Sequence, residues 1–107
     1  RTVATNSGRK LAIYDLSDTP GVYLGKKVFK RHGVEYCLTR ISATKWQIAA
    51  RPDGDLSLCG LAGTHDVAGT EVRAAGREDR LLSIEVPPAR ASDSLHEHII
   101  AWTQAAL

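Results

Sequence analysis

Apolar and polar residues alternate along much of the first 86 positions of this chain. The alternation is clearest at Trp46, Ile48 and Ala50, which are separated by polar or small residues. Successive side chains of a β-strand point to opposite faces of a sheet, so this spacing predicts a strand with one buried face. The Pro-Asp-Gly sequence at residues 52–54 favours a turn, and apolar residues resume up to Leu58. We therefore expect a β-hairpin in which residues 45–51 pair with the segment that follows the turn.

The same pattern predicts further strands on both sides of this hairpin. They are expected at residues 11–16, 22–31, 34–41, 70–75 and 80–86. Segments 22–31 and 34–41 should form a second hairpin with a basic tip, because they are joined by Arg-His-Gly. In the last of these strands, Leu82, Ile84 and Val86 share one parity and should face the core.

The spacing changes after the two prolines at 87–88, which cannot donate to a strand ladder. Leu95, Ile99, Trp102 and Ala106 then recur at intervals of three or four residues, which places them on one face of an α-helix.

A possible start of this helix is marked by Ser94 and Glu97, which match the Ser-x-x-Glu capping box. The helix should therefore run from about residue 93 or 95 to the C-terminus. Ile100 lies about 100° from the main apolar stripe. Together with Leu107 it could widen the apolar face into the seam of a homodimer.

Strands in succession followed by one helix predict an α+β fold. We expect a single domain over residues 1–107, built as an antiparallel β-meander of about five to six strands with one C-terminal α-helix (93–107) packed across the sheet. Residues 1–10 are polar and are expected to be flexible.

Composition places the chain among ordinary globular domains, with 43% hydrophobic and 24% charged residues. The apolar runs are too short to cross a bilayer, and the first ten residues carry no apolar signal segment, so we expect a cytoplasmic protein without membrane contact. Cys37 and Cys59 are expected to be two reduced, buried thiols, and a single bridge between neighbouring strands is the alternative.

Charge is divided unevenly along the chain. Residues 1–51 hold ten Lys or Arg against three Asp or Glu, whereas residues 52–107 hold four against nine, so the formal charges are +7 and −5. A cluster of like charge is stable when it is solvated or when it meets an oppositely charged surface.

The cations of the first half are interleaved with aromatic residues in the predicted basic hairpin. The candidate binding residues are Lys26, Lys27, Lys30, Arg31, Arg40, Tyr23, Phe29 and Tyr36. Cations attract phosphates or carboxylates, and flat rings can stack on bases, so this surface suits nucleic acid or an acidic protein. A solvated hairpin whose charges protect an exposed sheet edge explains the same residues.

Other chemistry has weaker support in the sequence. His96 and His98 are two residues apart on the predicted helix, about 200° around its axis, so they cannot bind one metal ion together. We expect neither a metal nor a cofactor. Cys59, His65 and Asp66 could form a thiol, base and orienting carboxylate if the loop at residues 60–69 folds back, although a flexible connection accounts for the same residues.

The sequence therefore predicts a small, non-enzymatic binding domain that presents a basic surface to an anionic partner. The first alternative is an assembly module that self-associates through its basic and acidic halves. The second is a small thiol enzyme that uses Cys59.

Overall fold

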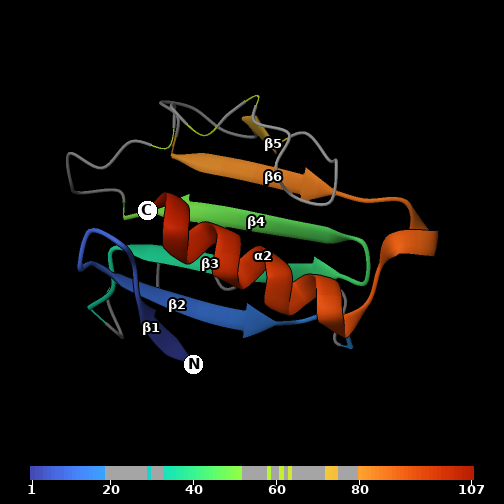
Figure 1. Ribbon diagram of the computed structural model, residues 1–107, viewed down its shortest axis with the longest axis horizontal. Helices are drawn as coiled ribbons and strands as arrows, with labels where there is room; N and C mark the ends of the chain where they lie inside the picture. Colours follow the sequence, from blue (N-terminus) through green and yellow to red (C-terminus); the bar gives the residue numbers. More distant parts are fainter. Residues whose placement is uncertain are drawn as a thin grey trace.

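The computed structural model describes residues 1–18, 29, 33–51, 58, 61, 63, 72–74 and 80–107, and these residues form a mixed β-sheet with a helix across one face (Figure 1). The strands are β1 (Thr2–Ala4), β2 (Lys10–Asp15), β3 (Tyr36–Ser42), β4 (Lys45–Ala50), β5 (Val72–Ala74) and β6 (Leu81–Glu85). Their order in the sheet is β1-β2-β3-β4-β6-β5. The predicted α+β class is thereby confirmed.

The predicted antiparallel meander is wrong in one pairing, because β2 and β3 are parallel. All other neighbouring strands are antiparallel. Two parallel neighbours cannot be joined by a tight turn, so the chain must cross over between them. Strand β3 has β2 on one edge and β4 on the other, which leaves no edge for the hairpin predicted between residues 22–31 and 34–41. Phe29, from the predicted strand, is helical, and its carbonyl oxygen accepts a hydrogen bond from the Gly33 amide at 3.0 Å.

Strand β4 confirms the predicted element but not its predicted partner. It lies between β3 and β6, so no edge remains for the hairpin expected across residues 52–54, and that prediction is also wrong. The tight turn instead joins β3 to β4, with a register shift between Arg40 and Ser42. Residues 52–57 lie outside the described residues.

The last two strands follow the prediction closely. Strand β5 pairs with β6 antiparallel, and Leu82, Ile84 and Val86 are buried as expected. Strand β6 ends before the two prolines, and a short 3₁₀ helix, η3 (Pro88–Arg90), leads toward the final helix.

Helix α2 (Asp93–Ala106) confirms the predicted C-terminal helix, but its cap is Ser92 and not Ser94. The Ser92 hydroxyl accepts a hydrogen bond from the Leu95 amide at 3.0 Å, which satisfies one of the free donors of the first turn. The buried residues of this helix are Leu95, His96, Ile99, Ile100 and Thr103. The apolar stripe is therefore rotated from the predicted one, and Trp102 lies at its margin.

Ile100 was expected to be available for a dimer seam, but it is 2% exposed and belongs to the core under α2. Leu107 also packs against this core. The apolar surface proposed for a homodimer is thus used inside the molecule.

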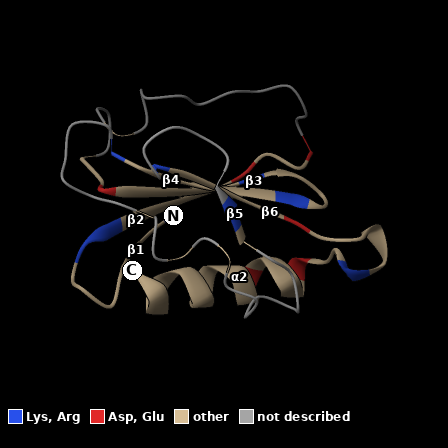
Figure 2. Ribbon diagram, turned by 90° about the horizontal axis from the view of Figure 1, so that it is seen from above, with Lys and Arg blue, Asp and Glu red and all other residues tan. Residues whose placement is uncertain are grey.

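Both faces of the sheet carry apolar residues. Figure 2 shows α2 along one face of the sheet. That face presents Leu11, Leu38, Ile48 and Leu82, which pack with Ile99 of the helix. The opposite face presents a smaller apolar cluster of Ala12, Cys37, Val34 and Phe29. Alternation along β2 and β3 divides their residues between these two clusters.

The N-terminal segment, expected to be flexible, contributes a strand to the sheet. Residues Thr2–Ala4 form β1 and pair with β2, and the turn that follows is bonded to α2 through the Asn6 amide and the Gln104 carbonyl oxygen at 2.8 Å. In the part of the chain described, no helix is both long enough and apolar enough to span a membrane.

Candidate functional site

Charged residues gather at the two ends of the sheet. One end contains the start of β2, the residues before β3, the residue after β4 and the residue before β6. Backbone hydrogen bonds bring these segments together: the Glu35 amide donates to the Lys10 carbonyl oxygen at 3.1 Å, and the Arg51 amide donates to the Glu35 carbonyl oxygen at 2.8 Å. Lys10, Glu35 and Arg51 therefore form one row across three neighbouring strands.

Two more arginines join this row. Arg80 lies beside the end of β4, where its carbonyl oxygen accepts from the Ala50 amide at 2.9 Å and its Nη1 donates to the Arg51 carbonyl oxygen at 2.9 Å. Arg9 precedes Lys10, and its Nη1 donates to the Tyr36 hydroxyl at 3.3 Å. We call Arg9, Lys10, Arg51 and Arg80 together the basic end.

The basic end is accessible at its β2 side. Arg9 and Lys10 are exposed, whereas Arg51, Arg80 and the intervening Glu35 are half-buried. The Glu35 carboxylate accepts a hydrogen bond from the Lys10 amide at 2.7 Å. The described residues at this end thus include four cations and one carboxylate. Figure 2 shows Lys and Arg at this end of the sheet, where the C-terminus of α2 lies, and also at the opposite end.

The other end of the sheet is mixed in charge, because Arg40, Lys45 and Arg90 lie there among acidic residues. It carries four carboxylates, from Asp15, Asp18, Glu85 and Asp93. Three of these are at or beyond strand ends, and Asp93 is the first residue of α2. An acid in the first turn also interacts favourably with the positive end of the helix dipole.

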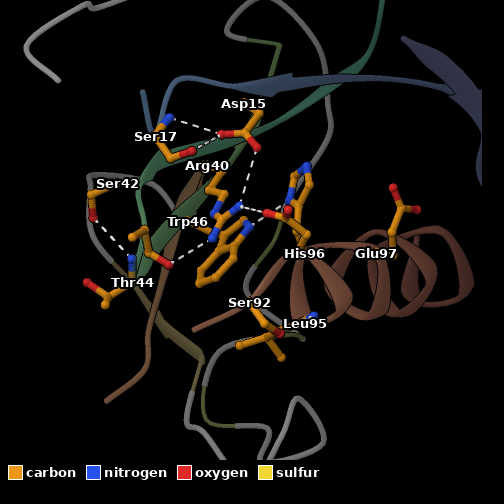
Figure 3. Close-up of polar contacts among 12 residues, drawn as sticks. Asp15, Ser17, Arg40, Ser42, Thr44, Trp46, Ser92, Leu95, His96 and Glu97 are labelled. Carbon is orange, nitrogen blue, oxygen red and sulfur yellow. Dashed lines mark hydrogen bonds and ion pairs between the residues drawn. The ribbon is translucent and has the colours of Figure 1, made fainter. Parts of the chain in front are cut away.

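A buried polar cluster lies at this second end, under the start of α2 (Figure 3). Asp15, Arg40 and Trp46 are direct neighbours in β2, β3 and β4, and α2 adds His96 and Asp93. We call these five residues the buried cluster after its centre, Arg40, Trp46 and His96; the Asp15 and Asp93 side chains at its edge are exposed. Arg40 is 5% exposed, and its guanidinium carbon lies 5.2 Å from the centre of the Trp46 ring.

Arg40 links the sheet to the helix. Its Nη1 donates to Asp93 Oδ1 at 2.9 Å and to Asp15 Oδ2 at 3.4 Å, and its Nη2 donates to the Ala43 carbonyl oxygen at 3.2 Å. Its Nε is buried and has no hydrogen-bond partner among the described residues. The guanidinium charge is therefore neutralised inside the molecule.

His96 of α2 is hydrogen-bonded to Trp46 within this cluster. The Trp46 indole Nε1 donates to His96 Nδ1 at 2.9 Å, and the two rings lie 6.3 Å apart with 26° between their planes. An accepting Nδ1 carries no proton, so the neutral ring must hold its proton on Nε2.

The electrostatic surroundings shift two pKa values in this cluster. Burial alone would raise the pKa of Asp15, but hydrogen bonds from Ser17 and the positive charge of Arg40, joined by that of His96 when its ring is protonated, outweigh it and hold the pKa below its ordinary value. Burial lowers the pKa of His96, and Arg40 and Arg1 act in the same direction against the carboxylates of Asp15 and Glu97.

The structure places three of the predicted binding residues inside the molecule. Phe29 is 8% exposed, Tyr36 is 3% exposed, and Arg40 belongs to the buried cluster. Phe29 and Tyr36 even pack on different faces of the sheet. These three side chains therefore do not form one exposed surface, and only the Tyr36 hydroxyl reaches the basic end, through Arg9.

The remaining predicted site residues lie outside the described residues. They are Tyr23, Lys26, Lys27, Lys30 and Arg31 of the basic hairpin, and Cys59, His65 and Asp66 of the thiol site. Cys37 is a free, buried thiol whose pKa is raised by burial, although its contact with the Thr39 hydroxyl acts in the other direction. Within the described ranges, no group of three or more His, Cys, Asp or Glu side chains is arranged to hold a metal ion.

Sequence reasoning missed Arg9 and Arg80 as members of a shared surface. They are 71 positions apart in the chain, and only the strand order brings them to one end. The burial of Arg40 could have been inferred, because Arg40 has the same parity as Tyr36 and Leu38 in one strand.

No protein-family model, curated protein or solved structure matches this chain.

Proposed function

We propose that this chain is a small binding domain that holds an acidic surface of a partner protein at its basic end. The observation that carries the proposal is the row of cations on neighbouring strand ends, of which Arg9 and Lys10 are exposed. Charges of one sign on adjacent rigid elements raise the local potential and guide an oppositely charged partner into place. Lys26, Lys27, Lys30 and Arg31 remain predicted contributors to the same interaction.

Two features favour an acidic protein over nucleic acid. Two of the three rings that were expected to stack on bases, Phe29 and Tyr36, are buried, and Trp46 is fully enclosed; the third, Tyr23, lies outside the described residues. Stacking contributes much of the affinity of single-stranded nucleic acid for proteins. Glu35 also lies between Lys10 and Arg51, where it would repel a continuous line of phosphates. A protein surface can instead present a donor or a cation to Glu35 and carboxylates to its neighbours.

A second copy of the chain is the second candidate partner. Asp15, Asp18, Glu85 and Asp93 lie at the end of the sheet opposite to the basic end. Contact between unlike ends of two copies would be heterologous and could continue from copy to copy. Such self-association would dissociate as salt screens the charges.

The test is a binding titration with two labelled probes, a poly-glutamate peptide and a single-stranded oligonucleotide, followed by fluorescence anisotropy at several salt concentrations. We expect the peptide to bind, and to bind more weakly as salt increases. Lys10→Gln should weaken peptide binding by about two- to fivefold, which corresponds to the loss of one exposed ion pair.

Lys45→Gln is the matched control, because it removes the same charge from the start of β4 at the other end of the sheet. It should leave the affinity unchanged. Equal loss in both variants would show that only the net charge matters, and no binding of either probe at low salt would refute the proposal. Tighter binding of the oligonucleotide would replace the acidic protein by nucleic acid as the partner. Sedimentation without any probe separates self-association from these outcomes.

A further inference from the structure

The hydrogen bond between Trp46 and His96 requires an uncharged imidazole. Trp46 can only donate through its indole nitrogen, so His96 Nδ1 must be the acceptor in this bond. A protonated imidazole has a hydrogen on both nitrogens and accepts nothing. Protonation would therefore bring two donors face to face at the 2.9 Å that now separates these atoms.

We propose that the first turn of α2 is an acid-sensitive latch, which is docked on the sheet while His96 is neutral and is released when His96 takes up a proton. The latch is defined by the contact of His96 with Trp46 and of Asp93 with Arg40. This regulatory role is separate from partner binding at the basic end, and it goes beyond the proposed function.

The carboxylates around His96 are already paired with arginines, so they offset an added charge only in part. Strand β3 contributes the Arg40 guanidinium, which already lies against Trp46. Strand β2 contributes the Asp15 carboxylate, which is paired with Arg40. Strand β4 contributes only the uncharged indole.

The remaining carboxylates near His96 are also paired. On α2 itself, Asp93 is bonded to Arg40, and Glu97 is bonded to Arg1 at 2.9 Å. A new positive charge on His96 would thus compete with Arg40 and Arg1 for acids that they already hold. Burial is the largest effect and lowers the pKa of His96 from its ordinary value of 6.5, and the Asp15 and Glu97 carboxylates offset this only in part.

Release should be limited to the start of the helix. Ile99, Ile100 and Thr103 are almost completely enclosed, and they hold the rest of α2 in the core. The first turn has fewer such contacts, because Asp93 and Ser94 are exposed and only Leu95 and His96 are buried there. Its undocking would uncover the Trp46 indole, which is 0% exposed when the latch is closed.

The experiment follows Trp46 fluorescence from pH 7.5 to pH 4.5 in a Trp102→Phe background, so that Trp46 is the one indole present. We expect the emission to shift to longer wavelength as the pH falls below 6.5, because the indole becomes hydrated. Amide exchange of residues 95–97, corrected for the intrinsic effect of pH, should become about tenfold faster at pH 5, the factor expected for one lost buried hydrogen bond.

His96→Gln is the decisive variant in this background, because its side-chain oxygen can accept from Trp46 at every pH. It should abolish the fluorescence step, whereas His98→Gln, on the exposed side of the same helix, should retain it. A step that persists in His96→Gln, or a wild-type emission that stays constant over this range, would overturn the latch.

A measurement on the unaltered chain keeps the proposal testable if His96→Gln does not fold. Nitrogen NMR of His96 should show the proton on Nε2 at pH 7.5, and the Trp46 indole N–H signal should move with the His96 titration. An indole signal that stays constant while His96 titrates would contradict the proposal.

Discussion

The most informative single substitution in this fold is Arg40→Met. The sequence suggests that Arg40 contacts a partner, whereas the structure places its guanidinium between the sheet and α2. Methionine retains much of the apolar stem and removes the charge. We therefore expect the variant to lose stability and to keep its affinity for an acidic probe.

The size of this loss follows from the contacts of the guanidinium. The bond to the Ala43 carbonyl oxygen is part-buried and should contribute about 1.5 kcal/mol, since the donor is charged. The ring contact with Trp46 should contribute about 1 kcal/mol. The ion pair with Asp15, whose side chain is 40% exposed, should contribute about 0.5 kcal/mol after solvent screening, and the fully exposed Asp93 adds little.

Removal of the charge also relieves a cost, because the buried Nε has no hydrogen-bond partner among the described residues. An unpaired buried donor costs about 1 kcal/mol or more, so the net loss should be about 2 kcal/mol. For a domain of this length, that corresponds to a decrease in Tm of about 10 °C.

Urea unfolding and thermal unfolding measure this loss directly. Arg90→Met is the matched control, because Arg90 is an exposed arginine in η3 at the same end of the sheet, and it should lower the free energy of unfolding clearly less than Arg40→Met does. Unchanged stability of Arg40→Met together with weaker binding of the acidic probe would refute the reasoning, because Arg40 would then serve the partner and not the fold.

Three further predictions concern α2 and its contacts. Ser92→Ala should cost about 1 kcal/mol through loss of the N-cap, whereas Ser94→Ala should cost less than half of that; equal effects in urea unfolding would contradict the capping assignment. Ile100→Ala should cost about 2–5 kcal/mol, because the side chain is enclosed in the core, and a surface-like effect below about 0.5 kcal/mol would speak against this placement. The folded state holds the pKa of Asp15 below 3.8, so the stability that its ionised form provides is present above that pH and is lost as the pH falls through the folded pKa. Asp15→Asn should therefore be less stable than wild type at pH 6 and closer to it at pH 2.5. A stability difference that stays constant with pH would oppose this view.

Local patterns in the sequence predicted several elements correctly. Alternation identified β4 and β6, because their buried faces recur every second residue. The prolines marked the end of β6, and the three-to-four spacing identified α2. The capping residue was misplaced by two positions, because Ser92 and Ser94 both precede an apolar series and only backbone geometry distinguishes them.

Strand pairing could not be predicted in the same way. Residues of β4 pair with residues of β6 that lie more than 30 positions further along the chain, so a nearby turn signal suggested the wrong neighbour. The parallel pairing of β2 and β3 has no local signature either, because it depends on the path of the chain between them. Both pairings depend on the tertiary fold, that is, on the order of the strands in the sheet.

The residues of the candidate site were also predicted only in part from the sequence. The charge count was right that the first half of the chain is basic. It treated Arg40 and Lys10 alike, although Arg40 is buried and Lys10 is exposed. Arg9 and Arg80 lie at the same end of the molecule only because β2 and β6 begin at the same end of one sheet. Which cations form a surface therefore depends on topology and parity more than on their density in the sequence.

The most direct test of binding at the basic end is NMR mapping with an ¹⁵N-labelled chain and an unlabelled poly-glutamate peptide at low salt. The proposal predicts that the largest shifts of backbone amides occur at Arg9, Lys10, Arg51 and Arg80, and that they disappear as salt is added. Shifts confined to the exposed side of α2, or to the opposite end of the sheet, would contradict it.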